Sequence, residues 1–266
     1  MQLGLEKKVA VVTGGSKGIG KAAAVALAGE GCRVAISARG EKKLQRTAEE
    51  IRQAGGEVLP LAGDMTSVRD IEKFVNSVVE RWQTVHILVN NVGSVGNAGS
   101  FEEVSDEDWM NLFELNVLSA IRLIRLVLPY MKEQQWGRII NISSESGIQP
   151  DPFMPHYNVT KAALINLTKS LSKAYGQDKI LVNTVSPAFI RTPLVESMMV
   201  EEGKKQGVST EEVFQQFLAQ NRPHIVLKRP GLSEEVAAAV VFLASERASF
   251  VTGSNYRVDG GSVASQ

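Results

Sequence analysis

The sequence predicts a single α/β domain over residues 1–266, with a doubly wound parallel sheet that carries helices on both faces. Two observations support this fold class. Short runs rich in β-branched residues alternate with helical patterns, as parallel strands and their crossover helices do. The strand-like runs are almost continuously apolar, as expected for strands covered on both faces. No Pro/Ser-rich linker or block of charge divides the chain, so one domain is expected.

The elements follow one another in a regular order. Strands are expected at Val9–Val12, Arg33–Ser37, Val58–Leu61, Ile87–Val89, Ile139–Ile142, Leu181–Val185 and Tyr256–Val258. Helices are expected between them, beginning with Ile19–Leu27 and the charged stretch Glu41–Gln53. Residues 192–229 interrupt this rhythm with a helical, methionine-bearing insertion. Two interpretations of the insertion stay open: a surface excursion with a small core of its own, or a lid over a pocket at the carboxyl ends of the strands.

Composition excludes several classes of function. Lys+Arg and Asp+Glu each number 29, so the formal net charge is zero and neither nucleic acid nor an anionic membrane is an expected partner. The single cysteine, Cys32, cannot form an internal disulfide, and the apolar runs are too short to span a bilayer; a cytoplasmic location is therefore expected. No His/Cys/Asp group has metal-ligand spacing, so no metal is expected.

The stretch "VAVVTGGSKGIGKAAAVAL" combines a strand, a glycine-rich turn and a helix. Gly14 permits a tight turn, Gly18 allows close approach to a ligand, and Gly20 lets the helix pack closely on the sheet. The helix N-terminus would present free N–H groups to a pyrophosphate. The spacing is G-x3-G-x-G, and a tight turn without a ligand is the alternative. Its position between the first strand and a helix favours nucleotide binding.

The residues after the second strand indicate which nucleotide is bound. A ribose 2′-hydroxyl calls for an acid there, whereas a 2′-phosphate calls for a cation. Ala38 occupies the expected acidic position, Arg39 follows it, and Lys17 lies inside the glycine turn. Each cation alone could be a solvated surface residue, but their joint placement favours NADP(H).

Tyr157 and Lys161 lie one helical turn apart in "MPHYNVTKAAL". Hydride transfer to a carbonyl leaves an alkoxide, so a proton donor must lie beside that oxygen. A nearby unpaired lysine would stabilise the phenolate and lower the pKa of the tyrosine. Ser144, 13 residues earlier and just after a strand, could donate a hydrogen bond to the substrate oxygen. Its neighbour Ser143 is the second candidate.

The chain resembles the short-chain dehydrogenase/reductase family. The matching segments are "TGGSKGIG" (13–20), "NNVG" (90–93), "ELNVLSA" with Asn116, "NISSESG" with Ser144, Tyr157-x-x-x-Lys161, "SPAFIRTP" (186–193) and "VTGSNYRVDGG" (251–261). The resemblance implies a Rossmann-type fold, and the family spacing favours Ser144 over Ser143. It also implies that Tyr157 is the general acid in reduction and the base in oxidation, that Lys161 hydrogen-bonds the nicotinamide ribose, and that Asn116 holds a water in a proton relay.

The resemblance also implies a wider set of cofactor contacts. They are Gly14, Ser16, Lys17, Gly18, Ile19, Gly20, Ala38, Arg39, Asp64, Met65, Asn91, Gly93, Tyr157, Lys161, Ile190 and Thr192. Asn90 is interpreted as structural. The sequence departs from the family pattern at Val92 and Ala188, where alanine and glycine are usual. Ala188 could shift the loop that carries Ile190 and Thr192.

The segment "ESGIQPDPFMPH" between Ser144 and Tyr157 is expected to form a stiff, partly apolar wall. The candidates to face the substrate are Ser144, Ser146, Gln149, Phe153 and His156. For His156, a solvent-facing position at the helix start is the alternative. In general layout the chain is most similar to 3-oxoacyl-carrier-protein reductase, although this segment and the long insertion differ from that enzyme's pattern. The substrate therefore stays open as a small-molecule ketone or a secondary alcohol.

These observations predict an NADP(H)-dependent oxidoreductase. The apolar helical patterns around Leu112–Met131 and Tyr157–Leu171, taken with the resemblance, imply a homotetramer. The alternative function is a catalytically idle NADP(H)-binding protein that senses redox state through a partner.

Overall fold

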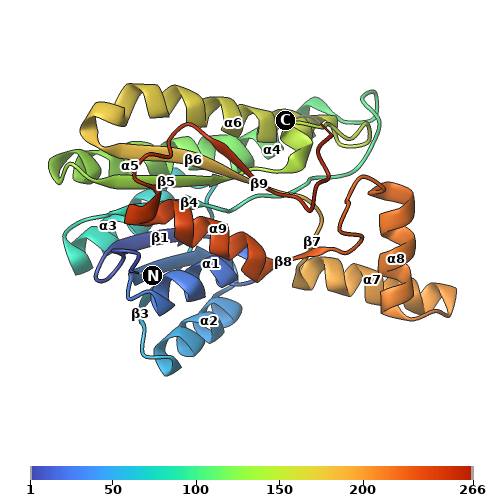
Figure 1. The fold of residues 1–266 in the computed structure, drawn as a ribbon, viewed down its shortest axis with the longest axis horizontal. Coiled ribbons are helices and arrows are strands. Elements are labelled where there is room, and N and C mark those ends of the chain that lie inside the picture. Colours follow the sequence, from blue (N-terminus) through green and yellow to red (C-terminus); the bar gives the residue numbers. More distant parts are fainter. Residues whose placement is uncertain (1, 265–266) are drawn as a thin grey trace.

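Seven parallel strands form the central sheet of the computed structural model, which describes residues 2–264 (Figure 1). Their order is β3-β2-β1-β4-β5-β6-β9. The bounds are β1 Val9–Thr13, β2 Arg33–Ala38, β3 Glu57–Ala62, β4 Ile87–Asn90, β5 Gly137–Ile142, β6 Ile180–Pro187 and β9 Asn255–Val258. Every strand that the sequence predicts lies within one of these. The predicted α/β fold class is confirmed.

Alternate residues of each strand face opposite helix layers. In β1, Ala10 and Val12 belong to one buried cluster, and Val9 and Val11 belong to the other. Helices α1 (Gly18–Gly29), α2 (Glu41–Gln53) and α9 (Ser233–Ala244) cover the first face. The second face is covered by α3 (Val68–Trp82) and α5 (Ser119–Glu133), with α6 (Pro155–Tyr175) packed beside them. Both faces of β1 are therefore buried, which explains its continuous apolar pattern.

From β1 the chain adds β2 and β3 toward one edge of the sheet, and it then returns to add β4 on the other side of β1 and to continue toward the opposite edge. The parallel neighbours β1 and β4 therefore mark the switch point of the topology. Chains leaving the carboxyl ends of these two strands run to opposite faces of the sheet, and this divergence opens the crevice where α/β proteins bind ligands. The loops after β1, β4, β5 and β6 carry the glycine turn, "NNVG", Ser144 and "SPAFIRTP" respectively. The topology thus brings the sequence motifs to one edge of the sheet.

The predicted insertion forms α7 (Pro193–Gln206) and α8 (Thr210–Asn221), which project from one end of the domain (Figure 1). A capping box between Ser209 and Glu212 begins α8. A small separate core of Met199, Val213 and Phe214 holds the two helices together. The short strands β7 (Ile190–Arg191) and β8 (Gly231–Leu232) pair in parallel and close the base of the insertion. The expectation of a core of its own is confirmed, and the lid role stays a prediction.

The remaining elements are short. They are α4 (Asp106–Phe113), the π-helical turn η1 (Glu114–Leu118), and the 3₁₀ turns η2 (Glu145–Gly147), η3 (Gly176–Asp178) and η4 (Glu246–Ala248). Within residues 2–264, none of the helices combines the length and apolar character that crossing a bilayer requires. Cys32 is buried, where a free cysteine behaves as a small apolar residue.

Candidate active site

At the glycines of the turn after β1, a side chain would be strained or would clash. Gly14 and Gly18 have φ of +68° and +55°, a region that residues with a Cβ rarely adopt. A Cβ at Gly20 would lie 2.3 Å from the Asn91 side-chain nitrogen and 2.4 Å from the Gly14 carbonyl oxygen. The predicted roles of Gly14 in the turn and of Gly20 in close packing therefore have a steric basis.

The N-terminus of α1 is open to an anion. Lys17 occupies the N-cap position in an extended conformation, and no side chain caps the helix. The first turn also holds no acidic residue. The free N–H groups and the positive end of the helix dipole therefore face the glycine turn without a protein partner from this cap, which suits a pyrophosphate.

The predicted cations lie at the same edge. Lys17 and Arg39 are both exposed, and Ala38 ends β2. Hydrogen bonds from Thr66 lower the pKa of Asp64, and the positive charge of Arg39 lowers it further. Arg39 and Asp64 are thus close enough to interact. Such proximity is compatible with contacts of both residues to one nucleotide. The Met65 side chain, in contrast, is buried in the core, so this predicted contact could involve only its backbone.

The segment after β4 is tied to the glycine turn. The Asn91 side-chain amide donates to the Thr13 carbonyl oxygen at 2.8 Å, and its backbone N–H donates to Thr13 Oγ1 at 3.0 Å. Asn90 donates to Asn141 Oδ1 at 2.8 Å inside the sheet, which agrees with its structural interpretation. Gly93 follows, where a Cβ would lie 3.1 Å from Asn116 Oδ1 and 3.4 Å from Lys161 Nζ.

Asn116 lies in the π-helical turn η1, a feature that often marks functional sites. Its side-chain nitrogen donates to the Ser94 carbonyl oxygen at 2.9 Å and to Thr160 Oγ1 at 3.0 Å. Its Oδ1 accepts the Ser94 N–H at 2.9 Å. The amide is therefore held rigidly beside the start of α6, next to Lys161.

Tyr157 and Lys161 share one face of α6, as the sequence predicts. Lys161 Nζ lies 5.6 Å from the centre of the Tyr157 ring and donates to the Ile142 carbonyl oxygen at 2.9 Å. The Ser144 hydroxyl is hydrogen-bonded to the Tyr157 phenol and also accepts the Ser146 N–H at 3.2 Å. Ser143 donates instead to the Lys161 carbonyl oxygen at 2.7 Å, which agrees with its weaker candidacy.

The electrostatics of Tyr157 differ from the sequence expectation. Burial raises the pKa of Tyr157, and the hydrogen bond with Ser144 only partly opposes this effect. Lys161 is also buried, and burial lowers its pKa to about 8. The sequence predicts that the lysine lowers the pKa of the phenol. The net shift has the opposite direction, because desolvation of the phenolate dominates it and Lys161 is not among the groups that shift this pKa. Stabilisation of the phenolate by Lys161 stays a prediction.

The predicted substrate residues do not all reach one cavity. Ser146 is buried directly after Glu145, and Gln149 Oε1 accepts the Ala264 N–H at 3.1 Å. His156 is fully buried, packs edge-on against Trp109 at 5.9 Å, and has no hydrogen-bond partner for either ring nitrogen within residues 2–264. Its burial argues against both the substrate contact and the solvent-facing alternative. Phe153 is exposed.

The loop after β6 approaches the glycine turn. A Cβ on Gly18 would lie 3.3 Å from Thr192 Cγ2, so Thr192 lies against the turn as predicted for a cofactor contact. Ile190 is buried. Together with Ala188, it lines a cavity of about 190 Å³ that also touches Ile225 and Leu227.

Sequence reasoning missed three charged residues beside this site. Glu145 follows Ser144 directly and is buried, and Asp151 lies in the segment before Tyr157. Arg222, the C-cap residue of α8, contacts both carboxylates. The acidic residues are visible in the sequence, but nothing in it places Arg222 next to them.

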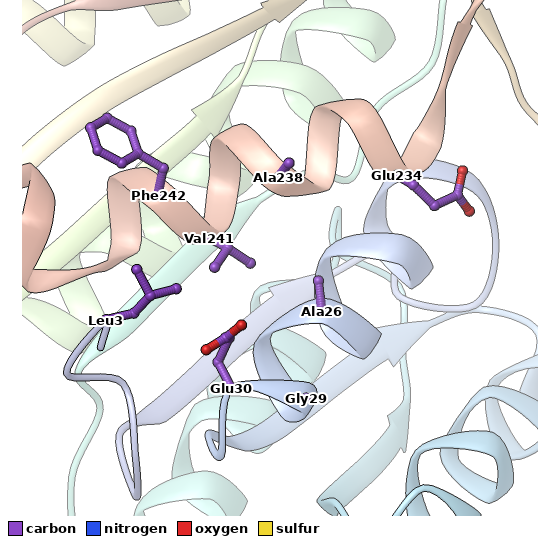
Figure 2. A pocket seen from close by; sticks show the side chains of 8 residues that line it. All are labelled: Leu3, Ala26, Gly29, Glu30, Glu234, Ala238, Val241 and Phe242. Carbon is purple, nitrogen blue, oxygen red and sulfur yellow. The ribbon is translucent and has the colours of Figure 1, made fainter. Parts of the chain in front are cut away.

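A second groove lies elsewhere. It runs between α1 and α9, has a volume of about 460 Å³, and is shown in Figure 2. Its lining is mostly small and apolar, with Glu30 and Glu234 as the charged side chains. It contains none of the candidate residues. Over the described residues 2–264, no group of His, Cys, Asp and Glu is arranged to hold a metal ion.

Known proteins resemble this chain over nearly its whole length. A family model described as enoyl-(acyl carrier protein) reductase matches residues 14–263. The 3-oxoacyl-acyl-carrier-protein reductase FabG of Thermotoga maritima is 34% identical, over 97% of this chain and 99% of that protein. L-sorbose reductase from Gluconobacter frateurii, complexed with NADPH and L-sorbose, has a TM-score of 0.95 and 37% identity over 100% of both chains. A variant of actinorhodin polyketide ketoreductase with NADPH has a TM-score of 0.87 and 36% identity, covering 97% of this chain and 98% of that one.

Proposed function

The chain belongs to the short-chain dehydrogenase/reductase family, and we propose that it is an NADP(H)-dependent enzyme that transfers hydride between nicotinamide and a ketone or secondary alcohol. One observation carries the proposal. The Ser144–Tyr157 hydrogen bond, buried Lys161 and rigidly held Asn116 meet beside an uncapped helix N-terminus and a glycine turn. A proton donor and a dinucleotide cradle at one edge suit hydride transfer to a carbonyl.

The residues present fit NADP(H). Any side chain at Gly14, Gly18 or Gly20 would be strained or would fill the cradle. Lys17 and Arg39 are exposed at the same edge and could pair with a 2′-phosphate. Several similar solved structures contain NADPH, among them L-sorbose reductase and the actinorhodin ketoreductase. These similarities support the same cofactor in this chain.

The side chains supply the proton side of the reaction. Bound NADPH would supply the hydride that reduces the carbonyl carbon. Tyr157 then gives its phenolic proton to the carbonyl oxygen, so that the products are the alcohol and NADP⁺. Because burial raises the pKa of Tyr157, the phenol is protonated near neutral pH, as an acid in the reductive direction must be. Ser144 donates to the same oxygen, and the Lys161 ammonium stabilises the phenolate that results.

We infer the substrate class from the charged side chains near the site. Glu145 and Arg222 lie close enough to Tyr157 to shift its pKa, and Arg222 also pairs with Asp151. Charged side chains beside the site suit a ketone that carries hydroxyl groups better than a long acyl chain, because hydroxyl groups can hydrogen-bond to them. The whole-length similarity to L-sorbose reductase supports a polyhydroxy ketone, whereas the similarity to FabG supports a 3-oxoacyl thioester. We give the polyhydroxy ketone first place.

Substitution of Tyr157 tests the proposal. Tyr157→Phe is expected to bind NADPH with nearly unchanged affinity, measured by the fluorescence of the bound dinucleotide, yet to lose at least about a hundredfold in turnover, because the proton donor is removed. Tyr175→Phe, at the far end of the same helix, is the matched control and should keep full activity. Turnover is followed by NADPH absorbance with L-sorbose and an acetoacetyl thioester as substrates.

The same experiment addresses the alternative function. An idle NADP(H) sensor would bind NADPH in both proteins and reduce no member of a wider panel of ketones and aldehydes. Substantial activity in Tyr157→Phe would reject the proposed mechanism. The homotetramer and the cytoplasmic location stay predictions, and light scattering of the purified protein would decide the first.

A further inference from the structure

A cluster of three charges connects the insertion to the catalytic segment. Arg222 ends α8, and its Nη1 lies 3.0 Å from Asp151 Oδ2. Its Nε lies 3.6 Å from Glu145 Oε1. The side chains of all three residues are largely withdrawn from solvent, with exposures of 21% for Arg222, 20% for Asp151 and 8% for Glu145. A single arginine therefore bridges two carboxylates in a partly desolvated place.

The two carboxylates bracket the segment between the catalytic candidates. Glu145 is covalently next to Ser144 and begins η2. Asp151 is anchored to α6, because its carbonyl oxygen accepts the Asn158 side-chain amide at 2.7 Å, one residue after Tyr157. Its Oδ1 accepts the Phe153 N–H at 2.9 Å, which shapes the same turn. Contacts from Arg222 therefore reach the segment at both ends.

Arg222 is one of the groups that stabilise the buried carboxylate of Glu145, together with a hydrogen bond from Ser262. The Glu145 Oε2 is buried and has no hydrogen-bond partner within residues 2–264. A buried carboxylate with one oxygen unpaired is costly unless a cation lies close, and removing the cation from such a pair leaves an uncompensated buried charge. The charged and titratable groups that face it from the packed elements are Arg222, His224, Asp259 and Tyr157, with Ser262 as a hydrogen-bond partner.

We propose that Arg222 is a positioning residue for the reaction at Ser144 and Tyr157: by docking on Glu145 and Asp151, it fixes the segment 145–151 and the insertion in one arrangement. The inference rests on the proposed function, since it assigns Arg222 to the same site. Arg222 acts through the two carboxylates, and α8 carries it to them. Closure of the insertion over the crevice and alignment of the two hydroxyl groups are then one event.

Glu145 and Arg222 also shift the pKa of the catalytic phenol in opposite directions. Glu145 raises the pKa of Tyr157 and Arg222 lowers it. An arrangement with Arg222 docked therefore makes Tyr157 a stronger acid than one with Arg222 withdrawn. An ion pair that only stabilised the insertion, too far from the phenol to affect it, would leave the ionisation of Tyr157 unchanged, so this ionisation tests whether the pair acts on the site, and kcat tests whether it positions the reacting groups.

The test uses Arg222→Gln, Arg222→Lys and Glu145→Gln in the full-length chain. Lys205→Gln is the matched control, because it removes a cation from an exposed ion pair on the same insertion. Arg222→Gln should lower kcat by at least about tenfold, since small misplacements of reacting groups are costly. Arg222→Lys should restore most of that loss, and Lys205→Gln should behave as the parent protein.

Ionisation of Tyr157 provides the second readout. It is measured as the ultraviolet difference between each protein and the same protein carrying Tyr157→Phe, which isolates this residue from the other tyrosines. Arg222→Gln should move its pKa upward, and Glu145→Gln should move it downward. Unchanged kcat in Arg222→Gln, or no movement of the phenol in either variant, would overturn the inference.

Two further outcomes keep the result interpretable. Where Arg222→Gln does not fold because Glu145 is left without its cation, the double variant Glu145→Gln/Arg222→Gln replaces it. In this variant the pKa of Tyr157 should lie near the parental value, because the opposite charge effects of Glu145 and Arg222 are both removed. Its kcat should still be lowered, and a parental kcat would reject the positioning role. Failure of the proposed function itself is distinguishable, because it would appear as activity in Tyr157→Phe of the otherwise unaltered chain.

Discussion

Replacing Lys161 with methionine is expected to abolish activity and at the same time to stabilise the protein. Lys161 is buried, and burial lowers its pKa from 10.5 to about 8. A shift of this size means that holding the ammonium form in the site costs about 3 kcal/mol near neutral pH. Methionine fills a similar volume without that cost. The variant also loses the 2.9 Å hydrogen bond to the Ile142 carbonyl oxygen, and this loss lowers its free energy of unfolding by about 1 kcal/mol.

The net expected gain is about 2 kcal/mol, or an increase in Tm of about 4–8 °C for a chain of this size. The pH dependence has a definite sign. Because the folded-state pKa lies below the unfolded-state value, the unfolded chain binds more protons between pH 8 and 10.5, and the parent protein gains stability as pH rises through that window. The advantage of Lys161→Met should therefore be complete near pH 7 and shrink toward pH 10.5.

Thermal unfolding of both proteins at several pH values measures this difference. Lys169→Met, an exposed lysine on the same helix, is the control and should change Tm little at any pH. The reasoning is refuted if Lys161→Met is less stable than the parent at pH 7, or if its advantage stays constant from pH 7 to 10.

Two further predictions concern the cofactor and acid stability. Arg39→Ala should raise the KM for NADPH at least about tenfold while changing the KM for NADH little, because a charge-assisted contact to the 2′-phosphate is lost; steady-state kinetics with both dinucleotides measure this, and equal changes would reject the assignment. His86 Nδ1 accepts the Val9 N–H at 3.1 Å, and burial lowers the pKa of His86 to about 4. Below pH 6.5 the unfolded chain therefore binds the extra proton, and stability should fall by up to about 3 kcal/mol between pH 6.5 and 4. His86→Asn keeps an acceptor but cannot titrate there, so its urea midpoint should fall less steeply with acid; equal slopes would contradict this.

The fold was predictable because its strands are apolar on both faces. The strands nevertheless extend further than the apolar runs, since polar residues continue them into the site. Thr13 and Asn90 end β1 and β4, and both are buried and hydrogen-bonded. Asparagine in isolation favours turns, and threonine, although it favours strands, interrupts an apolar run. Their partners lie on neighbouring strands and are not visible in a local window. The two-residue strands β7 and β8 are too short to show any periodicity.

The candidate site was predictable where chemistry and local spacing coincide. Tyr157 and Lys161 are one turn apart on any helix, so their common face follows from sequence. The burial of His156, in contrast, does not follow from local sequence. Its ring packs beside Gly96, where a Cβ would lie 2.6 Å from the His156 Nε2. That packing depends on a loop 60 residues earlier. Arg222 and Glu145 are likewise separated by 77 residues, and only the fold brings them within reach.

The raised pKa of Tyr157 changes the role that the neighbouring cations must have. A lysine that simply made the phenol acidic would leave part of it ionised before substrate arrives, and an ionised phenol cannot donate the proton that reduction requires. Burial instead keeps the proton on Tyr157. The lowered pKa of Lys161 shows that this cation, which donates to the Ile142 carbonyl oxygen, is held in place at a cost in stability. In the proposed mechanism its charge stabilises the phenolate that proton transfer leaves in the same desolvated space, and so opposes the effect of burial on the pKa of Tyr157. Docking of Arg222 adds a second cation whose presence depends on the insertion, so the acid strength of the site follows from the arrangement of the insertion as well as from α6.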